Sequence, residues 1–183
     1  MDVMDVSEVF LENAKKPQRS DVWRALRTLA IKIAAILLGA LIFFTFLYGA
    51  IRYTEAAMNP ALKDGDMVVY YRFFKDAYLP QDVIVFNKSG YKQVRRVVAL
   101  AGDVVDITPE GLVINGAVQQ ESGIYQRTER FQTGVDFPLT VPDGHVFVLA
   151  DSRAEAEDSR VYGCVKIEDT LGKVMTIVRR RLI

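Results

Sequence analysis

The chain is divided by one stretch, Ile33-Ala34-Ala35-Ile36-Leu37-Leu38-Gly39-Ala40-Leu41-Ile42-Phe43-Phe44-Thr45-Phe46-Leu47-Tyr48-Gly49-Ala50-Ile51, that contains no charged side chain. As a helix, such a stretch is long enough to cross a bilayer core of about 30 Å. A buried core helix would show a polar face, but Thr45 is the only clearly polar residue here. A cleavable signal sequence would be shorter and end in a small-residue motif, whereas Arg52 and Glu55 follow at once. The sequence therefore predicts a retained transmembrane anchor over residues 30–51.

Basic residues precede this stretch and predict its orientation. The positive-inside rule counts cations, so the acidic residues among them do not reverse it. We expect a single-pass protein of the plasma membrane, with a cytoplasmic N-terminal tail (residues 1–29) and an extracytoplasmic domain (residues 52–183). Trp23 and Tyr48 suit the two membrane interfaces as amphipathic anchors. The cations are Lys15, Lys16, Arg19, Arg24, Arg27 and Lys32.

Composition excludes several classes of function. The 183 residues, of which 50% are hydrophobic, suffice for one globular core besides the anchor. A formal net charge of zero and the lack of a basic stripe argue against nucleic acid as a partner. With one cysteine, Cys164, an intrachain disulfide is impossible, and the single histidine, His145, which lies where a predicted turn enters a strand, is expected to be structural and not to supply a zinc cluster or a Ser-His-Asp triad. We expect no metal and no cofactor.

Beyond Arg52 the pattern changes to short alternating runs broken by Gly, Pro, Asn and Asp, which is typical of a mainly β domain. Asn115-Gly116 predicts a two-residue hairpin turn, because both positions tolerate positive φ. The predicted strands are 67–73, 83–86, 91–100, 104–107, 112–114, 117–120, 146–149 and 171–178.

Four blocks of this outer domain follow one another in a recognisable order. They are Ala57-Met58-Asn59-Pro60-Ala61-Leu62 closed by Gly65-Asp66, then Asp82-Val83-Ile84-Val85-Phe86, then Arg95-Arg96-Val97-Val98-Ala99-Leu100-Ala101-Gly102-Asp103, and lastly Ala150-Asp151-Ser152-Arg153-Ala154-Glu155-Ala156-Glu157-Asp158-Ser159-Arg160-Val161-Tyr162-Gly163. Behind a transmembrane helix, this order resembles the type I signal peptidases of bacteria. The resemblance implies a signal-peptidase-like β-barrel or sheet domain. The chain departs from the family pattern at Gln81, Ala99, Ala101 and Ala156.

The resemblance places the family's catalytic dyad at Ala57, the serine nucleophile position, and at Arg95, the lysine base position. A methyl group cannot attack a carbonyl, and a guanidinium keeps its proton under any protein condition. Two residues before the nucleophile, where the family often has an oxyanion-hole serine or glycine, stands Glu55. A carboxylate there would repel the developing oxyanion. Whether Glu55 pairs with Arg95 is a question the sequence leaves open.

Neighbouring residues offer a poor replacement for the dyad. Lys92 lies three positions before Arg95, and an odd offset within one strand directs it to the opposite face. Ser89 lies in a predicted turn beside Gly90, and the family role of Ser159 is structural.

The family pattern keeps the residues that build the scaffold. It implies a buried acid–base pair of Asp158 with Arg160 and a second set of Asp151 with Arg153. A peptide groove for strand addition is expected between residues 66–73 and 83–86. The other structural positions are Met58, Pro60, Arg96, Asp103 and Ser159, and the groove residues are Asp66, Val68, Asp82, Val83 and Val85.

Two functions from different classes fit this pattern. The leading hypothesis is a pseudoenzyme: a non-proteolytic, membrane-anchored assembly factor or chaperone for a secreted surface protein such as a pilin, resembling signal-peptidase-like proteins that serve Gram-positive pilus assembly alongside sortases. The alternative is a true type I signal peptidase, a serine endopeptidase, with its dyad engineered away or relocated. A decoy that binds signal peptides and regulates an active paralogue cannot be separated from the first by sequence.

Overall fold

The computed structural model describes residues 19–73, 77–154 and 156–179. The chain divides into two compact units, one of residues 1–44 and one of residues 45–183. Of the predicted tail, residues 1–18 lie outside the described residues, whereas 19–29 are helical. The second unit is referred to below as the β domain.

The apolar stretch forms α2 (Arg19–Leu47), the one helix among the described residues that is long and apolar enough to be a candidate membrane span. None of its residues is buried against the rest of the protein. The limits of the helix differ from those predicted for the anchor, residues 30–51, at both ends. The helix begins earlier because the preceding residues include good helix formers such as alanine, leucine and arginine. It ends earlier because Tyr48–Arg52 form β1, whose backbone pairs with β2.

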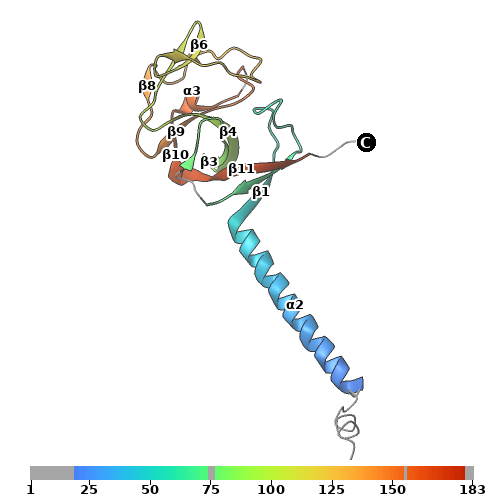
Figure 1. Cartoon of the computed structure of the whole chain (residues 1–183). Helices are drawn as coiled ribbons and strands as arrows, with labels where there is room; N and C mark the ends of the chain where they lie inside the picture. The colour runs from blue at the N-terminus through green and yellow to red at the C-terminus, as the bar shows by residue number, and fades with distance from the viewer. Residues whose placement is uncertain (1–18, 74–76, 155, 180–183) are drawn as a thin grey trace, which may run out of the picture. The chain divides into compact units, whose positions relative to one another are not determined.

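A seven-stranded antiparallel sheet forms the body of the β domain, in the order β1-β2-β11-β3-β4-β9-β10 (Figure 1). The C-terminal strand β11 is inserted between β2 and β3, so the two ends of the domain's sequence lie in one sheet. The bounds are β2 (Met67–Tyr71), β3 (Val83–Lys88), β4 (Tyr91–Leu100), β9 (His145–Leu149), β10 (Val165–Lys166) and β11 (Thr170–Val178).

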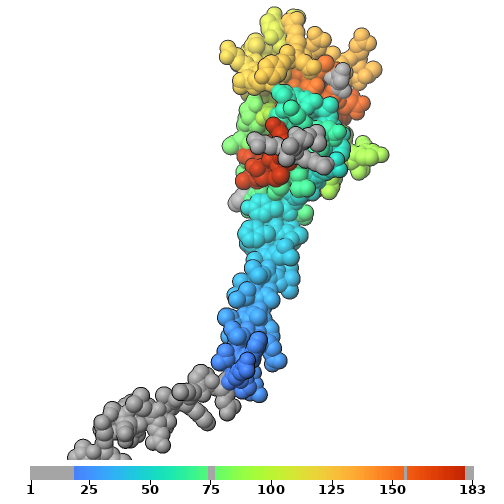
Figure 2. Space-filling model, turned by 90° about the vertical axis from the view of Figure 1, so that its right-hand side faces the viewer, coloured from blue at the N-terminus to red at the C-terminus, as the bar shows by residue number. Residues whose placement is uncertain are grey.

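A second, four-stranded sheet has the order β7-β6-β5-β8. The predicted hairpin turn is confirmed, with φ of 52° at Asn115 and 80° at Gly116 between β6 and β7. A long loop, residues 119–138, joins β7 to β8, and Figure 2 shows it in yellow to orange at one end of the β domain. The bounds are β5 (Val104–Thr108), β6 (Gly111–Ile114), β7 (Ala117–Val118) and β8 (Leu139–Thr140).

The prediction of a mainly β domain behind one N-terminal apolar helix is confirmed. Three apolar clusters fill the interior, and strands buried on both faces, such as β9, contribute to more than one of them. The predicted strands exist: 91–100 has the predicted ends, and the others differ by one or two residues. The sequence analysis missed β1, β8, β10 and the short helix α3 (Ser159–Tyr162).

Gln81 occupies a backbone conformation that suits glycine better. Its φ is 76°, and hydrogen bonds hold it there: its N–H donates to Val97 O at 2.8 Å, and its carbonyl accepts from Arg96 Nη1 at 3.0 Å. A left-handed conformation costs a residue with a Cβ about 1–2 kcal/mol. This is the position where the signal peptidase pattern has glycine.

Gln81→Gly is therefore expected to raise the free energy of unfolding by about 0.5–1 kcal/mol, because the relieved strain exceeds the entropy that glycine loses on folding. Urea denaturation of the full chain in detergent micelles measures it. The matched control is Asn87→Gly, an exposed position within β3 at which glycine should only destabilise. If the Gln81→Gly variant is as stable as the unmodified protein, or less stable, the backbone at Gln81 is not strained.

Candidate functional site

Ala57 and Arg95 face the same pocket, which has a volume of about 250 Å³. Three segments that are distant in sequence build it: the turn that follows β1, the strand β4, and the loop between β9 and α3. The residues that line it are Glu55, Ala56, Ala57, Arg95, Ser152, Ala156 and Glu157. The structure thus brings together the two positions that the sequence analysis assigned to the dyad.

The segment that carries Ala57 is held from both sides. The carbonyl of Ala57 accepts a hydrogen bond from Ser152 N at 2.9 Å, which ties the segment to the loop after β9. The next residue, Met58, is fully buried, and its N–H donates to the phenol oxygen of Tyr53 at 2.9 Å. Burial raises the pKa of Tyr53 to about 12, so this phenol is neutral at physiological pH. The backbone around Ala57 is therefore fixed by hydrogen bonds to buried groups.

Arg95 is bound on several sides. Its side chain is only 4% exposed, and Nη1 lies 2.9 Å from Glu55 Oε2, which answers the question that the sequence left open. Nε donates to Glu157 O at 3.0 Å, and Nη1 also donates to Val94 O at 2.7 Å. A guanidinium donates hydrogen bonds to such carboxylate and carbonyl acceptors and cannot act as a base.

The pocket offers few groups that could replace the dyad. Among the described residues that line it, Ser152 carries the only hydroxyl, and there is no lysine. Ser152 Oγ lies 3.4 Å from Gln126 Oε1. Lys92 is exposed at its position on β4, opposite Asn87 of β3. Ser159 is buried, and its Oγ accepts from Val148 N at 3.0 Å.

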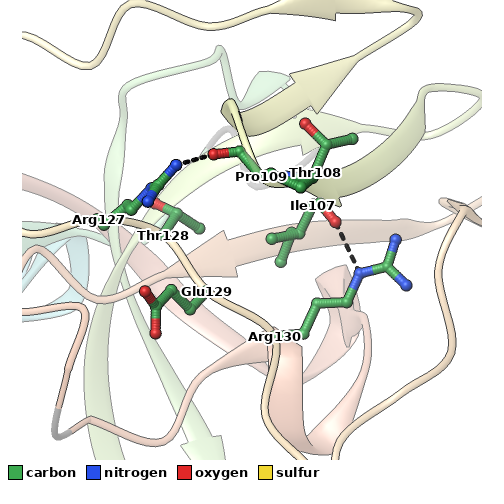
Figure 3. A pocket seen from close by; sticks show the side chains of 7 residues that line it. All are labelled: Ile107, Thr108, Pro109, Arg127, Thr128, Glu129 and Arg130. Carbon is green, nitrogen blue, oxygen red and sulfur yellow. Dashed lines mark hydrogen bonds between the residues drawn. The ribbon is translucent and has the colours of Figure 1, made fainter.

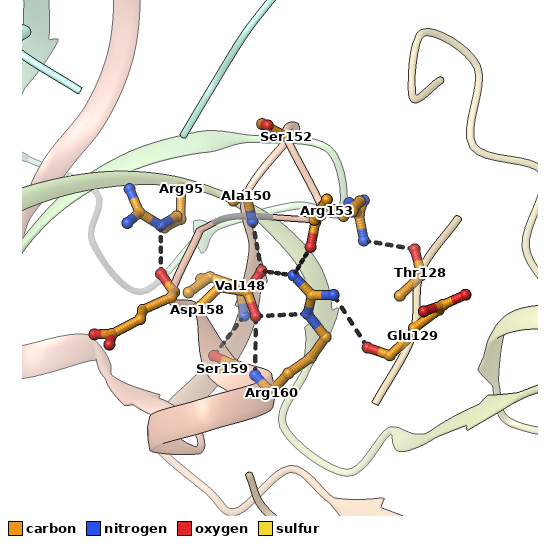
Figure 4. A network of polar contacts seen from close by, with 12 residues as sticks. Arg95, Thr128, Glu129, Val148, Ala150, Ser152, Arg153, Asp158, Ser159 and Arg160 are labelled. Carbon is orange, nitrogen blue, oxygen red and sulfur yellow. Dashed lines mark hydrogen bonds and ion pairs between the residues drawn. The ribbon is translucent and has the colours of Figure 1, made fainter. Parts of the chain in front are cut away.

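Beside the pocket, Asp158 and Arg160 form a buried, bidentate ion pair (Figure 4). The carboxylate oxygens lie 2.9 Å from Nε and Nη2 of the guanidinium, and the two side chains are at most 1% exposed. Asp158 also accepts from the backbone N–H of Arg160 and of Ala150, both at 3.0 Å. One carboxylate therefore caps α3 and holds the end of β9.

The long loop 119–138 closes over this pair. Arg160 Nη1 donates to Glu129 O at 3.1 Å, and its carbonyl accepts from Val135 N at 2.9 Å. The guanidinium also lies over the ring of Phe131, 4.6 Å from its centroid. The sequence analysis missed these partners because the loop has neither periodicity nor a recognisable motif.

The predicted pairing of Asp151 with Arg153 was wrong. Asp151 instead accepts two hydrogen bonds from Arg96, at 2.8 Å from Nε and 2.6 Å from Nη2, and so links β4 to the loop after β9. Arg153 is fully buried and pairs with Glu121 and Thr128 of the long loop. Within the described part of the chain its Nε has no hydrogen-bond partner. Neighbours in sequence point in different directions here because the loop turns between them.

The predicted groove walls also require a correction. The structure places β11 between β2 and β3, so residues 66–73 and 83–86 do not face one another across an open groove. Val68 and Val85 have no exposed surface and lie in the same core cluster, with Val83 packed against it. Asp82 instead forms an ion pair with Lys173 of β11 at 2.7 Å.

An incompletely paired strand edge lies next to the pocket instead. Strand β4 pairs with β3 from Tyr91 to Arg96, but with β9 only from Arg96 to Leu100. In the described residues, the first half of β4 therefore has a strand neighbour on one side only. That half leads directly into Arg95.

Two further aspartates of the motifs shape turns. Asp66 is buried and accepts from Lys63 N at 3.0 Å, which closes the segment that follows Met58 and the exposed Pro60. Asp103 accepts from Leu100 N at 2.8 Å and from Asn115 Nδ2 at 2.7 Å, which joins β4 to the second sheet.

A different pocket, of about 360 Å³, lies on the second sheet and contains none of the predicted site residues (Figure 3). Its two arginines make internal contacts: Arg127 donates to Pro109 O, and Arg130 donates to Ile107 O at 2.6 Å and pairs with Asp106. In the described part of the chain, no group of three or more His, Cys, Asp or Glu side chains is arranged to hold a metal.

Comparison with known proteins identifies the family of this chain. Residues 25–179 match the family described as signal peptidase, peptidase S26. The chain therefore belongs to the signal peptidase S26 family.

Relatives of this chain include bacterial signal peptidases. It is 31% identical over 141 residues to signal peptidase I of Bacillus licheniformis, which covers 72% of this chain and 75% of that protein. It is 30% identical over 148 residues to signal peptidase I U of Bacillus subtilis (strain 168), covering 75% and 79%. The crystal structure of a signal peptidase I from Enterococcus faecalis V583 is 30% identical, covers 55% of this chain and 97% of that chain, and has a TM-score of 0.46.

Proposed function

We propose that this member of the signal peptidase family is a pseudoenzyme that holds an extended segment of a secreted surface protein, such as a pilin, at the outer face of the plasma membrane without cutting it. The single observation that carries the proposal is the pocket in which Ala57 and the Arg95–Glu55 ion pair lie together. The proposed peptide site combines this pocket with the adjoining edge of β4. At positions 57 and 95 it has neither the hydroxyl nor the amine that a Ser/Lys dyad requires.

Glu55 adds a second obstacle to catalysis. A lysine at position 95 would lie close to the carboxylate that now contacts Arg95 Nη1 at 2.9 Å. An adjacent negative charge favours the protonated amine and therefore raises its pKa, whereas a general base needs a pKa near neutrality. The same carboxylate would destabilise an oxyanion formed beside it. The absence of the dyad and the presence of Glu55 therefore both disfavour catalysis.

The single-sided half of β4 supports binding without chemistry. Among the residues that the structure describes, 91–95 have β3 as their only strand partner, and they end at the pocket. An extended peptide can add to such an edge through backbone hydrogen bonds, while the pocket accepts one of its side chains. A protein that recognises the backbone of its client in this way can hold the client without cutting it.

The proposal includes a topology and partners. Residues 1–29, which include the start of α2, would lie on the cytoplasmic side and the β domain outside, as the cations before the apolar stretch favour. The family name refers to signal peptides, and the proposed client is the signal-peptide region or an adjacent extended segment of a secreted precursor. The sortase machinery that joins pilins is a proposed neighbour.

Cleavage of a secreted precursor by the full chain in detergent tests the enzymatic part of the proposal. The unmodified protein is expected not to cut. Ala57→Ser with Arg95→Lys restores the two reacting groups, and adding Glu55→Ser removes the charge that keeps the lysine protonated. If that charge raises the lysine pKa by about one unit, the triple variant cuts about tenfold faster than the double variant at neutral pH.

Signal peptidase I of Bacillus licheniformis serves as the positive control for the precursor and the detergent. Cutting at the signal-peptide junction by the unmodified protein would refute the pseudoenzyme and favour the peptidase alternative. Crosslinking of the same precursor to the unmodified protein tests holding separately. Absence of any crosslink near β4, with intact precursor present, would refute the holding role.

A further inference from the structure

The pairing of β4 with β3 shows which backbone groups of β4 face its open edge. The N–H of Val97 donates to Asp82 O at 2.7 Å, and its carbonyl accepts from Gln81 N at 2.8 Å, so both groups point toward the chain that leads into β3. Along a paired strand the backbone groups of successive residues point to alternate sides, and the register of β4 on β3 has no irregularity. Lys92 and Val94 therefore direct their N–H and C=O groups to the other side, where the described part of the chain provides no strand partner for them.

One acceptor on this edge is already in use. Val94 O accepts from Nη1 of Arg95 at 2.7 Å, so the guanidinium lies against the open edge of its own strand. The next residue that points to the same side, Arg96, is paired in register with Leu149 of β9. An added peptide strand can therefore run along Lys92 and Val94, and Arg95 lies where this strand must end.

Arg95 retains one uncommitted nitrogen. Its Nε donates to Glu157 O, and its Nη1 serves both Glu55 and Val94 O, but Nη2 has no hydrogen-bond partner among the residues that the structure describes. This nitrogen is not sealed in the interior, because Arg153 Nε is the one fully buried side-chain nitrogen or oxygen without a partner in the described part of the chain. Since only 4% of the Arg95 side chain is exposed and this residue lines the pocket, the accessible surface of Nη2 faces the pocket. The terminal nitrogens of Arg95 point away from the neighbouring network of buried contacts (Figure 4).

Two carboxylates limit which acceptor Nη2 can receive. Glu55, whose side chain is 35% exposed, and the exposed Glu157 both line the pocket. A carboxylate of the client would be repelled by these like charges, whereas a backbone carbonyl has no net charge and accepts hydrogen bonds from a guanidinium. An extended peptide on the edge of β4 brings a carbonyl to the pocket with its backbone alone. The pocket therefore suits a peptide carbonyl as the acceptor.

We propose that Arg95 is a client-binding residue: its Nη1 closes the open edge of β4 at Val94, and its Nη2 donates to a backbone carbonyl of the client segment where that segment enters the pocket. This contact fixes the register of the client, because a slip by one residue would turn the side chain in the pocket to the opposite face of the added strand. The inference rests on the holding role of the proposed function. It gives Arg95 a task in that role besides the absence of a base.

Binding of a fluorescein-labelled peptide to the full chain in detergent micelles, measured by fluorescence anisotropy, tests the inference. The peptide spans the signal-peptide junction of the precursor used in the cleavage assay. Arg95→Lys keeps the positive charge, but a single ammonium held by Glu55 has no second nitrogen for the client. We expect this variant to bind the peptide about tenfold more weakly, as the loss of one hydrogen bond to a charged group implies.

Arg130→Lys is the matched control. Arg130 also contacts a carboxylate, that of Asp106, and a backbone carbonyl, that of Ile107, but it lies at the other pocket on the second sheet. Its replacement should leave the affinity for the peptide unchanged. Equal weakening by Arg130→Lys and Arg95→Lys would overturn the inference.

A measurement on the unmodified protein decides the question if the Arg95→Lys variant does not fold. In proton–nitrogen correlation NMR spectra of the full chain in micelles, the Nε–H signal of Arg95 should shift when the peptide is added, because Nη2 of the same guanidinium gains an acceptor. The Nε–H signal of Arg130 should stay in place.

The possible results separate this inference from the proposed function. If the peptide binds the unmodified protein and the folded Arg95→Lys variant equally well, or if saturating peptide leaves the Arg95 signal in place, the inference is overturned while the holding role stands. If the peptide does not bind the unmodified protein, the holding role is refuted and the inference with it.

Discussion

Asp158→Ala is expected to lower the free energy of unfolding of the β domain by about 3–5 kcal/mol, which is a large part of the stability of an ordinary domain. Asp158 is fully buried and accepts four hydrogen bonds, from Arg160 N, Nε and Nη2 and from Ala150 N. Its removal leaves the guanidinium of Arg160, only 1% exposed, without an ionised partner. A buried charge that loses its partner cannot regain the hydration it gave up on folding.

Urea denaturation of the full chain in detergent micelles, followed by circular dichroism and pulse proteolysis, measures this loss. Glu157→Ala is the matched control, because it removes the exposed carboxylate one residue earlier and should change stability by less than about 0.5 kcal/mol. Asp158→Asn keeps the shape and removes only the charge, and it should destabilise nearly as much as alanine. A loss below about 1 kcal/mol for both Asp158 variants would contradict the assigned role.

Gly172→Ala is expected to destabilise the β domain by about 3–5 kcal/mol, from steric overlap and backbone strain together. A Cβ at this position would lie 2.0 Å from Tyr71 O and 2.7 Å from Tyr71 C. The φ of 150° at Gly172 also disfavours any residue with a side chain. Gly172 lies at the irregularity in the pairing of β11 with β3, so a shift there disturbs β11 and its two neighbours, β2 and β3.

Gly116→Ala separates the two contributions. Gly116 also has a positive φ, 80°, but a Cβ there would meet nothing within 4 Å. It should therefore show the conformational cost alone, about 1–2 kcal/mol. The same denaturation experiment compares the two variants. Equal losses at both positions would mean that the close approach of Tyr71 to Gly172 is not a stability determinant.

Several features could be predicted because they depend only on residues that lie close together in the sequence. An uncharged stretch around Ile33–Ile51 identifies an apolar helix whatever the rest of the chain does. Asn115-Gly116 identifies a hairpin because few residue pairs accept two positive φ values. The resemblance to the family implied the pair of Asp158 with Arg160, and the structure forms it beside one short helix, without help from elsewhere in the chain.

Features that depend on distant partners could not be predicted in this way. The end of α2 at Leu47 depends on β2, which takes Tyr48–Arg52 into a sheet. Strands of two residues, such as β8 and β10, carry no periodic signal at all. The groove prediction failed for the same reason: nothing near β2 or β3 indicates that β11, from the far end of the chain, lies between them.

The sequence by itself determined that positions 57 and 95 carry a methyl group and a guanidinium, because side-chain chemistry belongs to the residue and not to its surroundings. It also determined the order of an apolar helix and a β domain, because hydrophobic periodicity is local. Only the tertiary structure decided that Glu55 pairs with Arg95, that Asp151 pairs with Arg96, and that the guanidinium of Arg160 lies over the ring of Phe131. Ion pairs and ring contacts act over a few ångströms, and residues far apart in sequence come that close only when the sheet brings their strands together.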